Sequence, residues 1–259
     1  MAYDDEARPP MSPEGSGLAR GEDIVLTAAD GNRFSAFAAH PSDPTGARVI
    51  VLPDVRGLHP FYKGLALRFA EAGIAAMAID YFGRTAGVTG RDEAFDFKPH
   101  VQQLAATAVY TDARAALDYM EARGGTAPQP SFVVGFSIGG GLSLYLGSED
   151  MDLAGVVAFY PVLRRAMDDR KGTALASATT ITIPVLGLFG GDDPLVPPDQ
   201  VQQLDEQLDK AGIHHLLVTY PGAPHNFFDR KAAEFAAESA DAWERTLGFI
   251  AEQSRGVPS

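Results

Sequence analysis

The first patterned stretch of the chain, residues 23–41, alternates apolar and polar positions on both sides of Asp30-Gly31-Asn32. A period of two around a short turn of this composition predicts an antiparallel hairpin. Beyond residue 46 the pattern changes, because each strand-length run is almost wholly apolar. These runs are 47–54, 74–80, 131–135, 153–161, 183–190 and 214–222. Runs of this kind are typical of parallel strands that are buried on both faces.

Segments with helical spacing separate these apolar runs. They cover residues 61–73, 100–123, 138–147, 199–211 and 230–252. Because helices alternate with buried strands, the sequence predicts an α/β fold with a mostly parallel central sheet and helices on both faces. Residues 1–20 are rich in Pro, Ser and Gly, which predicts a flexible tail before a single domain over residues 21–259.

The composition of the 259 residues, 46% hydrophobic and 21% charged, fits one α/β core. The chain has no cysteine, which excludes disulfides, thiol nucleophiles and cysteine metal ligands. A net charge of −13 disfavours nucleic acid and anionic membranes as partners. No apolar run approaches the ~18 residues of a membrane span, and the acidic N-terminal stretch is unlike a secretory signal. We therefore expect a cytoplasmic protein.

Four glycines surround one serine in the stretch GFSIGGG, residues 135–141. Gly-x-Ser-x-Gly between a buried strand and a helix is the pattern of a nucleophile elbow, whose sharp turn requires small residues such as Gly135 and Gly139. This context predicts that Ser137 is a nucleophile and that the backbone N–H of Ile138 points toward a developing oxyanion. The alternative is a phosphate loop or a plain tight turn, although the GxGxxG and GxxxxGK spacings are absent.

A serine nucleophile needs a base and an acid, which in this architecture follow it on loops after strands, in the order acid then histidine. The stretch GGDDPLVP follows the run 183–190, and APHNFF follows the run 214–222. Among six histidines, His225 alone lies on such a loop. Asp192 and Asp193 are adjacent, so only one of them can face His225, and the residues alone leave both open.

The motifs VLPDVRGLHPFY, AIDYFGR, GFSIGGG, GGDDPLVP and YPGAPHNFF occur in this order between residues 47 and 250. In sequence and spacing they resemble the dienelactone hydrolase family of α/β-hydrolases. The resemblance implies an α/β-hydrolase fold without a large cap domain, a nucleophile–His–Asp triad, and hydrolysis of esters or lactones. It also implies that the enzyme needs neither a cofactor nor a metal.

Carried over by motif, the resemblance assigns the triad to Ser137, Asp193 and His225. The second oxyanion donor becomes the backbone N–H of Val55 in PDVRG, which would act with that of Ile138. The partner implied is a small-molecule ester or lactone. The sequence leaves open whether the protein is a homodimer.

Two further residues are implied as substrate-binding by the resemblance: Asp54 as an acid near the nucleophile, and Arg84 as a ligand for a substrate carboxylate. The alternative for Arg84 is a structural pair with a loop acid. Well-known members of the family carry cysteine at the position of Ser137, and an arginine where this chain has Asp229. We therefore expect a serine carboxylesterase. A dienelactone hydrolase proper and a non-catalytic binding module are the alternatives.

Overall fold

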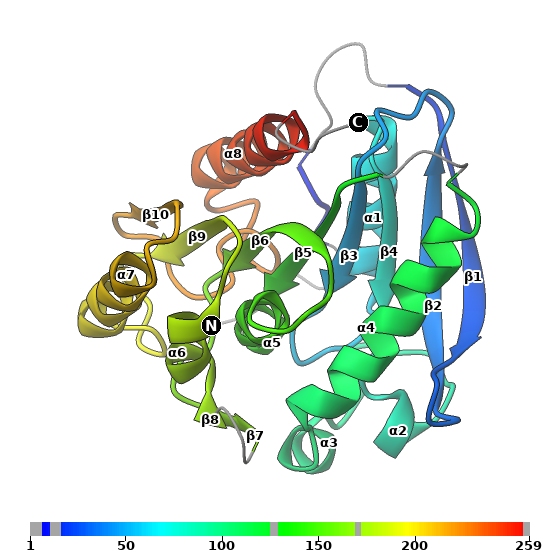
Figure 1. The fold of residues 1–259 in the computed structure, drawn as a ribbon, viewed down its shortest axis with the longest axis horizontal. Helices are drawn as coiled ribbons and strands as arrows, with labels where there is room; N and C mark the ends of the chain where they lie inside the picture. The colour runs from blue at the N-terminus through cyan, green and yellow to red at the C-terminus, as the bar shows by residue number, and fades with distance from the viewer. Residues whose placement is uncertain (1–6, 11–16, 125–128, 169–171, 256–259) are drawn as a thin grey trace.

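The computed structural model describes residues 7–10, 17–124, 129–168 and 172–255. Its centre is an eight-stranded sheet in the order β1-β2-β4-β3-β5-β6-β9-β10 (Figure 1). The strands are β1 (Ala19–Thr27), β2 (Arg33–Pro41), β3 (Arg48–Leu52), β4 (Ala75–Ile79), β5 (Ser131–Phe136), β6 (Leu153–Phe159), β9 (Val185–Gly190) and β10 (His215–Tyr220). The alternation of apolar runs and helical segments along the chain is thereby confirmed.

Strand β2 pairs antiparallel with β1 and with β4, and the other five pairs in the sheet are parallel. In the β1–β2 hairpin, Thr27 lies opposite Arg33 and Ala19 lies opposite Pro41. The predicted hairpin and the mostly parallel sheet are therefore confirmed. Strand β1 begins at Ala19, inside the stretch expected to be a tail, while the limits of the single domain stay a prediction.

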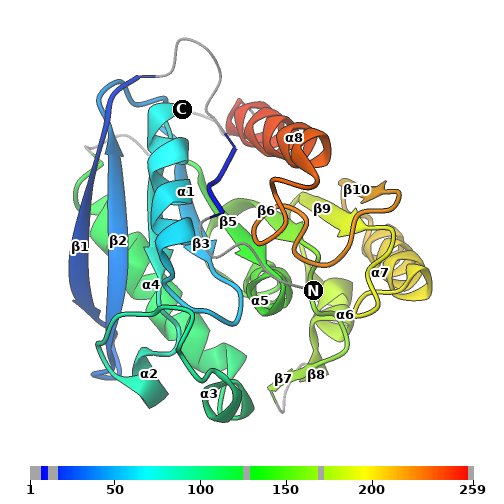
Figure 2. The ribbon, with the colours of Figure 1, turned by 180° about the vertical axis from the view of Figure 1, so that it is seen from behind.

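Helices cover both faces of the sheet, as predicted. Helices α1 (Pro60–Glu71) and α8 (Ala236–Ser254) lie on one face, which Figure 2 turns toward the viewer. Helices α4 (Ala106–Glu121), α5 (Ile138–Gly147) and α7 (Pro198–Ala211) lie on the other face, seen in Figure 1. The parallel strands all point their carboxyl ends to one edge of the sheet, where the loops that follow them gather.

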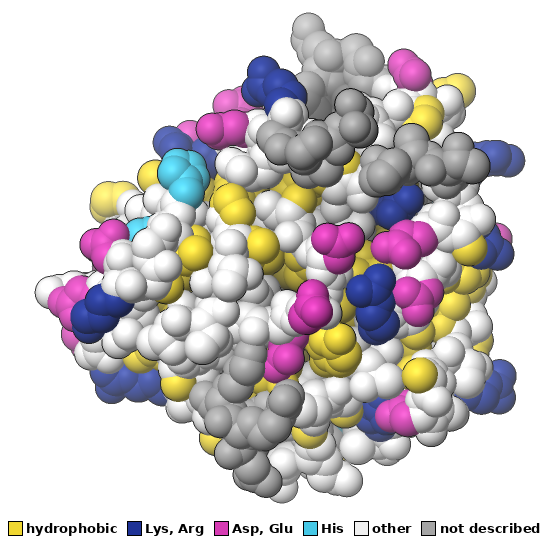
Figure 3. Space-filling model, in the orientation of Figure 1, with side chains coloured by type: hydrophobic (Ala, Val, Ile, Leu, Met, Phe, Trp, Pro, Cys, Tyr) yellow, Lys and Arg dark blue, Asp and Glu magenta, His cyan; other side chains and the backbone are white. Residues whose placement is uncertain are grey.

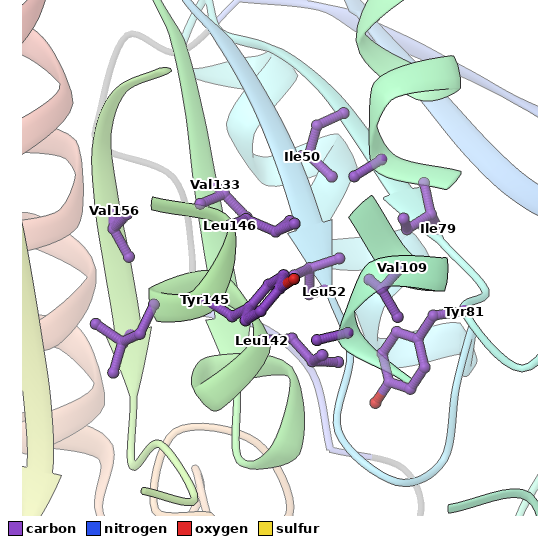
Figure 4. Packing of buried hydrophobic residues seen from close by; sticks show 14 of the residues in the cluster. Ile50, Leu52, Ile79, Tyr81, Val109, Val133, Leu142, Tyr145, Leu146 and Val156 are labelled. Atoms are coloured by element: carbon purple, nitrogen blue, oxygen red, sulfur yellow. The ribbon is translucent and has the colours of Figure 1, made fainter. Parts of the chain in front are cut away.

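Alternate residues of a strand supply the two hydrophobic cores, because successive side chains point to opposite faces. In β3, Ile50 and Leu52 belong to the cluster under α4 and α5, and Val49 and Val51 belong to the cluster under α1 and α8. Figure 4 shows the first cluster, in which side chains of β3, β5 and β6 pack against those of α5. This packing fixes α5, and with it the glycine-rich turn that precedes the helix.

Several short elements were not expected from the sequence. They are α2 (Gly83–Ala86), α3 (Lys98–Gln102), β7 (Ala166–Asp168), β8 (Gly172–Thr173), α6 (Ala174–Ser177) and a 3₁₀ helix (Ala178–Thr180). The helix expected over residues 100–123 is broken, because Ala105 has extended backbone angles, φ −114° and ψ 129°. The last helix begins at residue 236 instead of 230, after a series of turns. None of these elements amounts to a large cap domain within the described residues, as the resemblance implied.

Acidic and basic side chains are interspersed on the face that carries α4 and α5 (Figure 3). Among the described residues, no helix combines the length and the apolar character needed to cross a membrane.

Candidate active site

Ser137 lies at the turn between β5 and α5 with backbone angles of φ 55° and ψ −113°. A Cβ atom at Gly135 would lie 2.1 Å from the carbonyl oxygen of Gly139, and one at Gly139 would lie 2.2 Å from that of Pro53. Both positions therefore require glycine. The Ser137 N–H donates to the Phe159 carbonyl at 3.0 Å, which fastens the turn to the neighbouring strand. Such strain is typical of a functional turn.

The structure brings Ser137, His225 and Asp193 together. Ser137 Oγ lies 2.8 Å from His225 Nε2, and His225 Nδ1 lies 2.6 Å from Asp193 Oδ2. A carboxylate can only accept from Nδ1–H, so in the neutral imidazole Nε2 is left to accept the serine proton. Asp193 is buried and also accepts from the Leu195 N–H at 2.8 Å, whereas Asp192 is exposed. Asp193, and not Asp192, is the acid that faces the histidine.

Tyr160 forms one wall beside the histidine. Its ring centroid lies 4.9 Å from that of His225, and its backbone has a positive φ of 35° at the end of β6. A non-glycine residue in this region is strained, and such residues cluster at active sites. The tyrosine ring therefore limits the directions in which the imidazole can turn.

The loop after β3 packs against the serine turn, because Gly139 approaches the Pro53 carbonyl so closely. Val55 and Ile138, the two expected oxyanion donors, lie on this loop and at the first residue of α5. Among hydrogen bonds between described residues, neither of their backbone N–H groups has an acceptor. Neither N–H group is therefore occupied by a described part of the protein.

Asp54 does not have a free carboxylate. It is buried, and Oδ1 accepts from the backbone N–H of Arg56 at 2.9 Å and from its guanidinium Nε at 3.0 Å. The other side of that guanidinium reaches across to Asp229, with 3.1 Å between Arg56 Nη2 and Asp229 Oδ2. Arg56 therefore joins the loop after β3 to the loop that carries His225.

Asp229 lies fully buried at the centre of this connection. It accepts from Tyr62 Oη at 2.9 Å and from Asn226 Nδ2 at 3.4 Å, in addition to Arg56. Burial raises the pKa of the Asp229 carboxyl, and the nearby Arg56 opposes that rise. Asn226, directly after His225, has a positive φ of 64°. The contacts of Asp229 therefore hold the backbone beside the histidine.

The ion cluster extends to the segment before α3. Glu93 Oε1 lies 3.6 Å from Arg56 Nη1 and 3.1 Å from His59 Nε2, and Glu93 Oε2 lies 3.5 Å from Arg230 Nη2. Arg230 Nε is also 3.8 Å from Asp54 Oδ2. Three carboxylates and two guanidinium groups thus meet beside the triad. The carboxylates therefore balance the positive charge of the two arginines.

The guanidinium of Arg84 pairs with acidic side chains of two other elements. Its Nη1 lies 2.5 Å from Asp30 Oδ2, and its Nη2 lies 2.7 Å from the buried Asp112 and 3.2 Å from the Ala108 carbonyl. These partners belong to the tip of the β1–β2 hairpin and to α4. The guanidinium holds α2 against both elements, as in the structural alternative for this arginine.

Arg56 and Tyr62 were not expected beside the site from the sequence. Arg56 directly follows the expected oxyanion residue in PDVRG, and a charged residue there is a signal that could have been used. Tyr62 lies on the buried side of α1 and has no such local signal. Among the described residues, no group of three or more His, Cys, Asp or Glu side chains is arranged to hold a metal ion.

Relatives with assigned names match nearly the whole chain. A "Putative carboxymethylenebutenolidase" of Escherichia coli (strain K12) is 26% identical over 256 residues, which cover 93% of each chain. A "Probable 2-oxo-3-(5-oxofuran-2-ylidene)propanoate lactonase" of Bradyrhizobium sp. is 26% identical over 233 residues, 88% of this chain and 93% of that protein.

A solved structure has the same fold. The crystal structure of a "Putative Dienelactone Hydrolase" from Klebsiella pneumoniae subsp. pneumoniae MGH 78578 matches with a TM-score of 0.80 at 25% identity. The match covers 91% of this chain and 99% of the Klebsiella chain. In addition, the sequence model of the dienelactone hydrolase family matches residues 34–254. The chain therefore belongs to the dienelactone hydrolase family, with the α/β-hydrolase fold.

Proposed function

We propose that this protein hydrolyses carboxylic esters or lactones through an acyl-enzyme on Ser137. The observation that carries the proposal is the chain of short contacts from Ser137 Oγ through His225 to the buried Asp193, placed on a strained turn. Membership of the dienelactone hydrolase family and the lactonase name of one relative support the same reaction class. This arrangement is the one that acyl transfer through a serine requires.

In the first half of the reaction, His225 Nε2 takes the proton of Ser137 Oγ while that oxygen attacks the substrate carbonyl carbon. Asp193 orients the imidazole and stabilises its cation. The backbone N–H groups of Val55 and Ile138 donate to the oxyanion, where one lost donor costs on the order of 10²–10³ in turnover. The imidazolium then gives its proton to the leaving alkoxide, and the C–O bond breaks.

In the second half, a water molecule gives a proton to His225 and attacks the acyl carbon. A second oxyanion forms, and its collapse breaks the bond to Ser137 Oγ, which regains a proton from the imidazolium. The products are a carboxylic acid and an alcohol, or one hydroxy acid if the substrate is a lactone. No cofactor enters these steps.

We further propose that neutral substrates are preferred over carboxylated ones. Arg84 is engaged by Asp30 and Asp112, and Arg56 is engaged by Asp54 and Asp229. Cations whose charge is already balanced attract a substrate carboxylate weakly, and the net charge of −13 adds repulsion that salt screens. A higher kcat/KM for a carboxylated lactone than for a neutral acetate ester would contradict this preference.

The test of the proposed function is hydrolysis of short-chain 4-nitrophenyl esters by the wild type and by Ser137→Ala. We expect the variant to lose essentially all activity with an unchanged circular dichroism spectrum. The matched control is Ser143→Ala, since Ser143 is buried in the helix that follows the serine turn and donates to the Gly140 carbonyl. It should keep wild-type kcat. The expected cytoplasmic location remains a separate prediction of the sequence, which leaves open whether the protein is a homodimer.

A further inference from the structure

Two consecutive carbonyl groups converge on the hydroxyl of Tyr81. Tyr81 Oη lies 2.8 Å from the Pro53 oxygen and 2.7 Å from the Asp54 oxygen. Tyr81 follows β4 and is buried, with its ring 4.7 Å from that of Phe82. Figure 4 shows the ring beside Val109. A tyrosine of the core therefore reaches the backbone of the loop that carries Val55.

The peptide unit between Asp54 and Val55 is planar and trans, so its C=O and its N–H point in opposite directions. The Asp54 carbonyl accepts from Tyr81 Oη and, at 3.1 Å, from the Gly57 N–H. Holding this carbonyl in place also holds the direction of the Val55 N–H. That N–H is the second oxyanion donor of the proposed function, on which this inference rests.

Apart from the Gly57 N–H, the other contacts of the loop with described residues act on neighbouring peptides. Arg56 and Asp54 pair through their side chains and through the Arg56 N–H, one peptide further along the chain. The Pro53 carbonyl is pressed against the serine turn at Gly139. Tyr81 is thus the side chain that acts on the Asp54–Val55 peptide itself.

We propose that Tyr81 is a positioning residue for the oxyanion hole. Its single O–H proton is shared between the backbone carbonyls of Pro53 and Asp54, and so keeps the Val55 N–H turned toward the tetrahedral intermediate. A phenylalanine in place of Tyr81 would fill the same space in the core without the hydroxyl. The neighbouring Phe82 is an equally buried aromatic residue. The hydroxyl is therefore the part that serves the reaction, and it does so without touching the substrate.

A hydroxyl that orients an oxyanion donor has a different kinetic signature from one that only supports the fold. The donor acts on the transition state, so its loss lowers kcat and leaves KM nearly unchanged. It also weakens binding of an inhibitor that forms a tetrahedral adduct, such as a trifluoromethyl ketone. A purely structural hydroxyl would instead change the melting temperature and the fraction of active protein.

The test is Tyr81→Phe, with Tyr110→Phe as the matched control, because Tyr110 also donates to a backbone carbonyl, that of Asp150, at 3.2 Å. Active sites are titrated with a fluorophosphonate, and kcat is expressed per titrated site. We expect kcat of Tyr81→Phe to fall about 10-fold, equivalent to about 1.4 kcal/mol, with KM within about twofold of wild type. The inhibition constant of the ketone should rise by a similar factor. Tyr110→Phe should match the wild type in all three quantities.

Wild-type kcat per titrated site and an unchanged inhibition constant for Tyr81→Phe would overturn the inference. So would a loss of activity that disappears once the number of active sites is taken into account. The outcome is separate from the proposed function, because Ser137→Ala tests that independently. If Ser137→Ala is inactive and Tyr81→Phe is not impaired, only the role of Tyr81 is wrong.

Discussion

At the scale of single residues, the site depends on positions with unusual steric or backbone requirements. Gly135 and Gly139 have no room for a Cβ atom, and Ser137 and Tyr160 both have positive φ angles. A strained residue of this kind costs on the order of 1–3 kcal/mol and persists only where the surrounding structure holds it. Here strands β5 and β6 and helix α5 hold the strained residues in place.

The choice between two adjacent acids is a prediction at this scale. Asp193→Asn should lower kcat by a factor on the order of 10³–10⁴, because an amide can donate to Nδ1 and favour the wrong imidazole tautomer. Asp192→Asn is the control, since Asp192 is exposed and its N–H is bound to the Ala223 carbonyl. Steady-state hydrolysis of a 4-nitrophenyl ester measures both. Equal losses in the two variants would reassign the acid.

At the scale of elements, the buried pair Arg56–Asp229 connects the loop after β3 to the loop after β10. Both side chains are almost completely buried, with 3% and 0% of their surface exposed. Taking a charge out of water is costly, and here each buried charge is compensated by the other. Removing one partner would leave the other charge buried and unpaired. The connection therefore makes the two loops dependent on each other.

Removing one partner should destabilise the protein strongly. We expect Asp229→Ala to lower the free energy of unfolding by about 3–5 kcal/mol, because Arg56 loses a buried counter-charge. The control is Arg245→Met, which breaks an exposed pair with Asp241 and should cost about 0–1 kcal/mol. Urea denaturation gives both values. A loss below 1 kcal/mol for Asp229→Ala would mean that water or other groups replace the contact.

The two ion pairs of Arg84 lead to another prediction for the elements. Arg84→Ala should lower the melting temperature, because the hairpin tip and α4 lose a shared contact. It should change kcat/KM for a neutral ester and for a carboxylated lactone by the same small factor. Kinetics on the two substrates measure this. A selective loss on the carboxylated lactone would restore the substrate-binding role.

At the scale of the whole molecule, stability depends on pH through buried acids. Burial raises the pKa of Asp112 to about 6, although Asn32 and Arg84 bond to its carboxylate. A raised acid pKa means that the folded state binds the proton more tightly than the unfolded state. The stabilisation that comes from protonated Asp112 is therefore fully present below its ordinary pKa of 3.8. It is lost as the pH rises through its raised pKa of about 6.

The variant Asp112→Asn removes this titration. Comparison with it therefore tests whether Asp112 makes the free energy of unfolding fall as the pH rises. Between pH 4 and pH 7, the free energy of unfolding of the wild type should fall relative to that of the variant. Urea denaturation at several pH values measures the difference, and Asp118→Asn on the exposed side of the same helix is the control. A difference that stays constant, or that grows in the opposite direction, would contradict the raised pKa.

Local pattern was enough to predict the main strands and helices along the chain, because strands buried on both faces are almost wholly apolar. It also placed the serine turn, whose glycines have a direct steric cause. The break at Ala105 was not predicted, because the helical spacing of apolar residues continues across it. Arg56 and Asp229 lie 173 positions apart, so no local pattern indicates their contact. The same holds for the contacts of Arg84 with the hairpin and α4.

The central claim is that Ser137 is the nucleophile of an ester hydrolase. The most direct measurement is mass spectrometry of peptides from the folded protein after treatment with a fluorophosphonate, a reagent for activated serines. We predict one adduct per chain, on the peptide that contains Ser137, and none in His225→Ala, where the base is missing. A folded wild-type protein without an adduct, or with the adduct on another residue, would contradict the account.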